Sequence, residues 1–162
     1  MESPPQEEKE YTLVFCRRKL SNGDQEVLLG MKKRGFGVGK WNGFGGKLEE
    51  GESNEAAALR ELEEECSVTS SALSRQGYLV FSMEESNKLM KVHVFETWEF
   101  SGEPSESSEM RPQWFNESNI PYDSMWPDDK YWLPLLLAGK KFIGRFDYSD
   151  EETIEDFSVR EQ

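Results

Sequence analysis

Three glutamates, Glu61, Glu64 and Glu65, are spaced so that a helix would bring their carboxylates together. Successive residues of an α-helix are rotated by about 100°, so positions i, i+3 and i+4 lie on one face. Two carboxylates about 5 Å apart repel each other by roughly 3 kcal/mol at an effective dielectric constant near 20. Three together are therefore unfavourable unless a cation joins them, and an all-oxygen site of this kind suits magnesium or manganese.

The same spacing is also typical of a solvated acidic face that binds nothing. The apolar side chains of this segment form a separate stripe, about 120° away on the helical wheel. That stripe consists of Ala58, Leu59, Leu62 and Cys66. With either interpretation, a metal site or a solvated face, one face of the helix would pack on the core and another would carry the three carboxylates.

A longer motif surrounds the glutamates and favours the metal site. Residues 46–68 read GKLEEGESNEAAALRELEEECSV. This segment resembles the Nudix box, G-x5-E-x7-R-E-U-x-E-E-x-G-U, and matches it at every position except one. Ser67 stands where the family has a glycine that suits the left-handed end of a helix, and a serine there costs about 1 kcal/mol.

The resemblance implies a role for several residues in and near the box. Arg60 would orient the acids, and Glu52 would tie the preceding loop to the helix. Glu109, outside the box, matches a further carboxylate that relatives use near the metal, although its setting alone indicates an exposed loop acid. The implied catalytic residues are Arg60, Glu61, Glu64, Glu65 and Glu109, and the implied metal ligands are these four glutamates with the Gly45 carbonyl. Mg²⁺ is the expected cofactor, with Mn²⁺ as a substitute.

The likeness extends beyond the box, from Tyr11 to about Val159. The segments GMKKRGFGVGKWNGFGGK, LMKVHVF, EMRPQWF and MWPDDKYWLPLLL resemble the MutT-homologue branch of the Nudix hydrolases. That branch destroys oxidised purine nucleoside triphosphates such as 8-oxo-dGTP and 2-hydroxy-dATP. The chain departs from its relatives in a longer connection over 17–25, at Lys91 where relatives carry an acid, and in its acidic ends.

The resemblance also implies a base pocket of aromatic and methionine faces, with a few polar groups that read the edges of a purine. Asp128 and Asp129 have an alternative role, because acids that follow a proline in the first turn stabilise a helix. His93, in an alternating strand pattern, is interpreted as a structural side chain. The implied substrate-binding residues are Thr12, Lys32, Phe36, Asn42, Phe44, Gly45, Gly46, Lys47, Phe81, Met90, Met110, Trp126, Pro127, Asp128, Asp129 and Trp132.

Composition narrows the class of protein. The chain has 162 residues and a net charge of −13, which argues against a nucleic-acid polymer or an anionic membrane as partner. No apolar run reaches the length of a membrane span, and the acidic first ten residues have the character of neither a signal nor a transit peptide. Two cysteines, Cys16 and Cys66, fit a reducing compartment. The cytosol is the expected location, with a nuclear or mitochondrial fraction left open.

The remaining pattern predicts an α+β domain over 1–162 with acidic ends at 1–10 and about 150–162. Ser53 is the expected N-cap of the first helix. Residues 17–25 would connect two strands through an Asn22-Gly23 turn, 101–112 would be a surface loop, and the acidic end a frayed or edge segment. We expect strands over 11–15, 27–31, 77–82, 91–100, 113–115 and 141–148, and helices over 54–66 and 129–137. With the resemblance, this is a Nudix fold, a mixed β-sheet between helices (α/β/α).

The leading hypothesis is a metal-dependent, monomeric enzyme that hydrolyses oxidised purine nucleoside triphosphates to the monophosphate and pyrophosphate. Its purpose would be to cleanse the nucleotide pool, and its partner a small nucleotide. One alternative keeps the chemistry but takes another nucleoside diphosphate derivative. Another is a Nudix-fold module that binds a nucleotide without cleaving it, although such a module would be expected to lose one of the acids.

Overall fold

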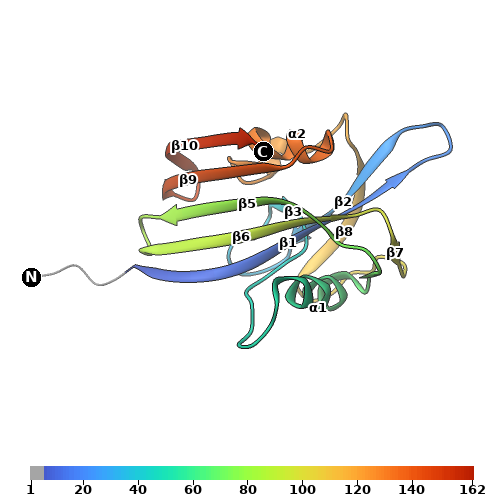
Figure 1. Ribbon diagram of the computed structural model, residues 1–162, viewed down its shortest axis with the longest axis horizontal. Coiled ribbons are helices and arrows are strands. Elements are labelled where there is room, and N and C mark those ends of the chain that lie inside the picture. The colour runs from blue at the N-terminus through green and yellow to red at the C-terminus, as the bar shows by residue number, and fades with distance from the viewer. Residues whose placement is uncertain (1–5) are drawn as a thin grey trace, which may run out of the picture.

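Ten strands, two α-helices and one short 3-10 helix make up residues 6–162, the part of the chain that the computed structural model describes (Figure 1). Residues 1–5, part of the expected acidic N-terminal end, lie outside this range. The first half contains β1 (Glu7–Lys19), β2 (Gln25–Lys32), β3 (Trp41–Asn42), α1 (Asn54–Cys66), β4 (Thr69–Ser70) and β5 (Ser74–Met83). The second half contains β6 (Lys88–Thr97), β7 (Phe100–Ser101), β8 (Met110–Asn116), η1 (Tyr122–Ser124), α2 (Asp129–Leu137), β9 (Phe142–Asp150) and β10 (Thr153–Glu161).

A mixed sheet of eight strands forms the centre of the described chain, in the order β10-β9-β5-β6-β1-β2-β3, with β8 also paired to β2. The long strand β1 has two partners in succession. It pairs in parallel with β6 from Glu7 to Cys16, and antiparallel with β2 from Arg17 onward. The strand therefore joins the two parts of the sheet.

The two helices cover opposite faces of this sheet. Neighbouring residues of a strand point to opposite faces, and β1 shows the alternation directly. Val14 and Cys16 pack with the α1 side chains, whereas Phe15, between them, packs with Trp132 of α2. The middle of this strand packs on both sides, which agrees with the continuous apolar run over residues 13–16. The predicted α+β fold, with a mixed sheet between helices, is confirmed.

Local signals account for the ends of α1. The Ser53 hydroxyl accepts a hydrogen bond from the Ala56 N–H at 3.1 Å, so Ser53 is the N-cap. At the other end Ser67 has φ +64° and ψ +28°, a left-handed conformation, and its N–H donates to the Glu63 carbonyl. Both predicted helices have the bounds that the sequence predicted, although Pro134 lies within α2.

Several strands extend further than the sequence predicted. Arg17–Lys19 continue β1 instead of belonging to a connecting loop, so the turn is limited to residues 20–24. Met110–Pro112 open β8, and Phe100 lies in the short strand β7 instead of ending β6. The acidic C-terminal segment is an edge strand, β10, paired antiparallel with β9. Each extension exists because a partner strand supplies hydrogen bonds that no local sequence pattern reveals.

Arg17 lies where β1 changes partners, and its side chain is 1% exposed. It forms ion pairs of 2.8 Å with Glu96 of β6 and with Glu117 beyond β8. Its guanidinium group also lies 4.7 Å from the centre of the Trp98 ring. A buried cation therefore bridges the two parts of the sheet.

Both cysteines are free thiols buried in the cluster that packs on α1. Burial raises the pKa of both thiols, that of Cys66 to about 12.

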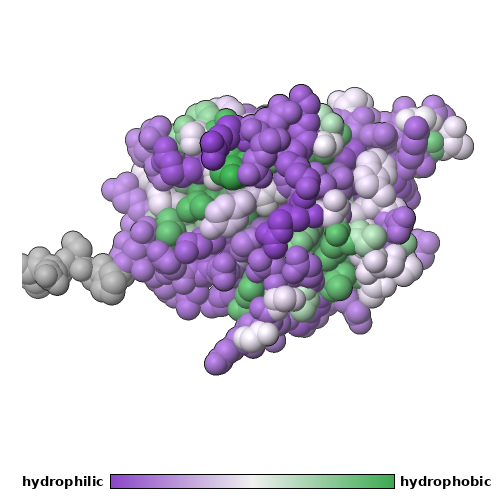
Figure 2. Space-filling view, viewed as in Figure 1, coloured by the Kyte–Doolittle hydropathy of each residue, from purple (hydrophilic) through white to green (hydrophobic). Residues whose placement is uncertain are grey.

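Hydrophilic side chains cover most of the face drawn in Figure 2, and apolar groups are exposed there only in smaller areas. Within residues 6–162, neither helix has the length and apolar character needed to cross a membrane.

Candidate active site

The acidic helix α1 presents two of its glutamates to a pair of glycines. The Gly45 N–H donates to Glu65 Oε1 at 2.8 Å. A Cβ atom added to Gly46 would lie 2.6 Å from the Glu61 carboxylate, and one added to Gly45 would collide with the Thr12 carbonyl. The close approach of this loop to both β1 and α1 therefore requires residues without side chains.

The three glutamates differ strongly in burial, which the helical wheel did not predict. Glu65 is 6% exposed, and burial is the main cause that raises its pKa to about 8. Burial also raises the pKa of Glu61, against the opposing effect of Arg60. Glu64 stays exposed. Glu65 is consequently not part of a solvated acidic face, because its carboxylate has been taken out of water.

Arg60 holds several of these carboxylates at once. Its guanidinium donates to Glu52 at 2.7 Å, to Glu61 at 2.8 Å and to Glu64 at 3.3 Å. The hydrogen bond from Arg60 lowers the pKa of Glu52 to about 2. These are the contacts that an orienting role for Arg60 and a tethering role for Glu52 require.

Glu109 immediately precedes β8 and faces cations instead of the helix. Its carboxylate accepts from Lys32 at 3.0 Å and pairs with Arg34 at 2.6 Å. These hydrogen bonds lower the pKa of Glu109. Glu109 still contributes, at longer range, to the raised pKa of Glu65. The structure thus brings Glu109 into the electrostatic surroundings of the acidic helix but pairs it with Lys32.

The donor set near Gly45 suits a hard divalent cation. Glu61, Glu65 and the adjacent glycine backbone offer only oxygen ligands, which magnesium and manganese prefer. In residues 6–162, however, no group of three or more His, Cys, Asp or Glu side chains is arranged to hold a metal ion. Glu64 and Glu109 are turned toward basic side chains. The full set of predicted ligands therefore remains a prediction.

A cavity of about 610 Å³ opens beside these acids. Glu65 lines it, together with most of the residues that the sequence assigned to substrate binding. Those are Thr12, Lys32, Phe36, Asn42, Gly45, Gly46, Phe81, Met90, Met110, Trp126, Asp128, Asp129 and Trp132. The acidic helix and the predicted base slot consequently share one space.

Seven predicted residues do not line this cavity. Phe44 pairs with Val14, so its ring is fully buried on the α1 side of the sheet. The Lys47 carbonyl accepts from Arg60 at 3.2 Å, which places its backbone beside the acidic helix. The other five are Arg60, Glu61, Glu64, Glu109 and Pro127.

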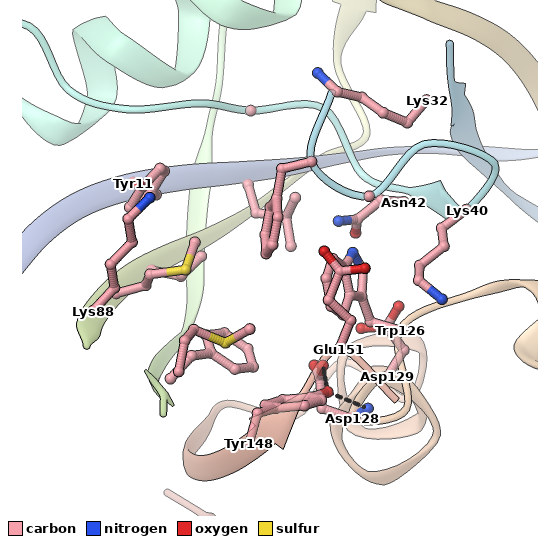
Figure 3. A pocket seen from close by; sticks show the side chains of 18 of the residues that line it. Tyr11, Lys32, Lys40, Asn42, Lys88, Trp126, Asp128, Asp129, Tyr148 and Glu151 are labelled. Carbon is pink, nitrogen blue, oxygen red and sulfur yellow. Dashed lines mark hydrogen bonds between the residues drawn. The ribbon is translucent and has the colours of Figure 1, made fainter. Parts of the chain in front are cut away.

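Two buried aspartates close one end of the cavity. Asp128 Oδ2 accepts from Trp132 Nε1 at 2.6 Å, and Asp128 Oδ1 accepts a short hydrogen bond from the Tyr148 hydroxyl (Figure 3). Asp128 precedes α2 but makes no side-chain capping bond, so helix capping does not explain its position. Burial raises the pKa of Asp128, and burial together with Asp128 raises that of Asp129 further.

Two unpartnered polar atoms belong to residues that line this cavity. Asp129 Oδ2 and Thr12 Oγ1 are buried and have no hydrogen-bond partner within residues 6–162. Unpaired buried polar atoms are costly, so native proteins rarely keep them without a ligand or water to satisfy them. A ligand in the cavity could therefore form hydrogen bonds with Asp129 Oδ2 and with Thr12 Oγ1.

Aromatic rings form the mouth of the same cavity. Phe36 packs on Trp126 with ring centres 4.9 Å apart, and Phe36 is 55% exposed. Lys40 Nζ lies 5.3 Å from the centre of the Trp126 ring. The Trp126 indole is flat and has the Lys40 ammonium group near its ring, so it is a suitable surface on which a base can stack.

Sequence reasoning missed several lining residues, including Tyr11, Lys40, Lys88, Tyr148 and Glu151 (Figure 3). For Tyr148 a signal existed. It lies on the same face of β9 as the buried residues Phe142, Gly144 and Phe146. A period of two along the strand was enough to place Tyr148 on the inner face.

His93 lies outside the cavity lining. Its Nδ1 is 2.9 Å from an Arg75 nitrogen, and its Nε2 is 3.2 Å from Glu10. An arginine can only donate, so Nδ1 accepts and the Nε2–H donates to Glu10. These contacts suit the structural role that the sequence predicted.

Known proteins resemble this chain over most of its length. Residues 12–136 match the NUDIX domain. The Mus musculus protein named oxidized purine nucleoside triphosphate hydrolase is 51% identical over 151 residues, which cover 93% of this chain and 94% of the mouse protein. The Danio rerio protein of the same name is 50% identical over 135 residues, which cover 83% of this chain and 86% of that protein.

A solved structure shows the same fold. The MutT protein from Bacillus halodurans superposes with a TM-score of 0.80 at 24% identity, covering 93% of this chain and 97% of that one. The domain match includes the acidic helix, the glycine pair and the aspartate pair described above. On the domain match and on the identity to the mouse and zebrafish proteins, the chain belongs to the NUDIX domain family.

Proposed function

We propose that this protein is a metal-dependent hydrolase that converts oxidised purine nucleoside triphosphates to the monophosphate and pyrophosphate. The observation that carries the proposal is the shared cavity, which has a buried aspartate pair at one end and Glu65 of the acidic helix on its wall. The names of the mouse and zebrafish relatives support the same substrate class. We propose 8-oxo-dGTP and 2-hydroxy-dATP as substrates.

The base end of the cavity supplies stacking and edge recognition. The Trp126 indole and the Met90 and Met110 side chains offer apolar faces for a purine ring. The Asn42 amide has both a donor and an acceptor, and Asp129 Oδ2 is free of other partners in the described chain. A base that leaves such groups unpaired would bind less well, which gives the slot its selectivity.

The acidic end supplies the site of reaction. Glu61, Glu64, Glu65, Glu109 and the Gly45 carbonyl are the proposed ligands of a divalent cation, and Arg60 fixes the orientation of Glu61 through a 2.8 Å bond. When bound, such a cation neutralises phosphate oxygens and lowers the pKa of water. Lys32, 3.0 Å from Glu109, provides a further positive charge for the phosphates.

We also propose the finer attributes expected from the sequence. Magnesium is the proposed cation, with manganese as a substitute, because both favour carboxylate and carbonyl oxygens. The proposed active unit is a monomer, a single domain over residues 1–162. Its proposed location is the cytosol, where it would cleanse the nucleotide pool.

A magnesium titration tests the proposal. Purified protein is incubated with 8-oxo-dGTP, or with dGTP as a matched substrate, while pyrophosphate and orthophosphate are both measured. We expect magnesium-dependent release of pyrophosphate and the monophosphate, with 8-oxo-dGTP preferred. Orthophosphate and a nucleoside diphosphate as first products would contradict it. Binding without turnover at saturating magnesium would point instead to a recognition module.

A further inference from the structure

Tyr148 is a cavity residue whose hydroxyl group is committed to the aspartate pair. It donates a short hydrogen bond to Asp128 Oδ1, and it accepts from the Asp128 backbone N–H at 3.0 Å. The tyrosine comes from β9 and the aspartate from the residue before α2, so the contact joins two consecutive elements across 20 positions of the chain (Figure 3). The Tyr148 side chain is buried, so water does not compete for this bond.

Asp128 therefore has a donor on each of its carboxylate oxygens. Trp132 Nε1 lies 2.6 Å from Oδ2, and an indole N–H can only donate. The Tyr148 hydroxyl already accepts from the Asp128 N–H, so its own proton is directed to Oδ1. A carboxyl group that accepts on both oxygens is stabilised as the carboxylate. Nothing in these contacts favours a proton on Asp128.

Asp129 has the opposite environment. It is 2% exposed, and its Oδ2 has no partner in residues 6–162. Within residues 6–162, the titratable groups that interact with Asp129 besides Asp128 are Tyr148 from β9, Lys40 from the loop before β3 and Tyr122 from η1, and Glu151, after β9, lines the same cavity. Lys40 opposes protonation of Asp129, but burial and the neighbouring Asp128 outweigh it. Two adjacent buried carboxylates cannot both ionise at low cost.

We infer that the Tyr148 hydroxyl, by donating to Asp128, assigns the proton of the aspartate pair to Asp129 and so sets the hydrogen-bonding pattern that the cavity offers to a base. The pattern is an acceptor at Asp128 and a donor at Asp129. The raised pKa values of the pair agree with this order, since that of Asp129 is raised further. Tyr148 is thus a positioning residue that determines specificity without taking part in the reaction.

The inference deepens the proposed function, on which its purine substrate rests, but its effect on the two carboxyl groups is independent of any substrate. Without the hydroxyl, Asp128 keeps only the Trp132 donor, and the proton is free to move between the two aspartates. Oxidised guanine and oxidised adenine present different edges. Tyr148→Phe is therefore expected to change which of the two substrates is preferred.

The first test measures the protonation of the two aspartates directly. Aspartate carboxyl ¹³C resonances are followed from pH 4 to pH 9 in the wild type, in Tyr148→Phe and in Tyr131→Phe, with assignments from Asp128→Asn and Asp129→Asn. Tyr131 is a matched control, because its ring packs on Phe157 and it does not line the cavity. We expect Asp128 to titrate at lower pH than Asp129, in a separate step, in the wild type and the control, and to share the titration of Asp129 in Tyr148→Phe. Identical titration of Asp128 in all three proteins would overturn the inference.

The second test reads specificity. The ratio of kcat/KM for 8-oxo-dGTP to that for 2-hydroxy-dATP is measured from pH 5 to pH 9 in the same three proteins. We expect the ratio to change by about tenfold in Tyr148→Phe, the equivalent of one pKa unit, and its pH profile to move, with no change in Tyr131→Phe. An equal fall for both substrates, with an unmoved pH profile, would reduce Tyr148 to a packing residue and overturn the inference. If the wild type hydrolyses neither nucleotide, the proposed function fails, while the carboxyl titration still decides the proton assignment.

Discussion

Replacing either buried aspartate by asparagine fixes where the donor and the acceptor lie on that side chain. In Asp128→Asn the amide must also meet the donors Trp132 and Tyr148. We expect kcat/KM to fall by about 10- to 100-fold for at least one of 8-oxo-dGTP and 2-hydroxy-dATP, because a mismatched buried polar group costs about 1 to 3 kcal/mol. Equal efficiency of Asp128→Asn and Asp129→Asn on both nucleotides across pH would contradict a role of the pair in recognition.

The buried Asp129 also affects stability. Its pKa in the folded protein is raised, so the native state binds a proton that the unfolded chain has already released above about pH 4. Its contribution is present below pH 4 and is lost as pH rises through the folded pKa. We expect the stability of Asp129→Asn relative to the wild type to be greater at pH 8 than at pH 5, because only the wild type loses this contribution as pH rises. Urea unfolding at the two pH values measures this, and an equal shift at both would contradict it.

Glu65 tests the acidic end of the site. A solvated surface face was one interpretation that the sequence left open for this carboxylate, but it is buried, and its pKa is raised to about 8. Glu65→Gln substitutes a neutral group that burial already favours, so we expect the variant to fold. Turnover at saturating magnesium should fall by at least about 100-fold, since a metal ligand is lost. Near wild-type turnover would remove Glu65 from the proposed ligands, and Glu63→Gln, an exposed change on the same helix, is the control.

At the scale of single elements, the C-terminus of α1 carries a strain that the sequence predicted. Ser67 is left-handed, a conformation that a glycine adopts without cost. We expect Ser67→Gly to stabilise the protein by about 0.5 to 1 kcal/mol, or about 2 °C in Tm, with unchanged kcat. Ser67→Ala keeps the strain and serves as the control. A lower Tm for Ser67→Gly would mean that the 2.9 Å contact between Ser105 and Ser67 outweighs the strain.

Elements with local signals were predictable, and those defined by distant partners were not. The bounds of α1 follow from a cap and a run of helix formers within one segment, and the start of α2 was predicted from Pro127. The ends of β1, β8 and β10 depend on pairing with other strands. The strands predicted for β1 and β8 were therefore too short, and the prediction for the β10 segment left a frayed end and an edge strand as alternatives. Within the site, most of the residues found lie in the segments that resemble the family, although Lys40, in one of those segments, was missed. The strand period could have placed Tyr148 on the inner face of β9, but its contact with Asp128, 20 positions away, has no local signal.

At the scale of the whole molecule, Arg17 connects the parts of the sheet. Its ion pair with Glu96 is almost fully buried. Removing one partner of a buried pair costs up to about 3 to 5 kcal/mol, and without Glu96 the buried Arg17 would keep only the partly exposed Glu117 as an ionic partner. We expect Glu96→Ala to lose about that much free energy of unfolding, with kcat preserved in the folded fraction, because neither residue lines the cavity. Glu117→Ala, whose carboxylate is 37% exposed, should cost much less in the same urea titration.

The burial of both thiols makes the protein easy to label at a chosen point. Thiol reagents attack the thiolate, and Cys16 and Cys66 are shielded and hold their protons near neutral pH. The β1–β2 hairpin projects from the body of the molecule (Figure 1), and Ser21 in its turn is exposed. A cysteine placed there would react with a maleimide ahead of the native pair. A fluorophore or a surface tether could thus be attached without replacing the buried cysteines. Binding of nucleotide could then be followed on single molecules.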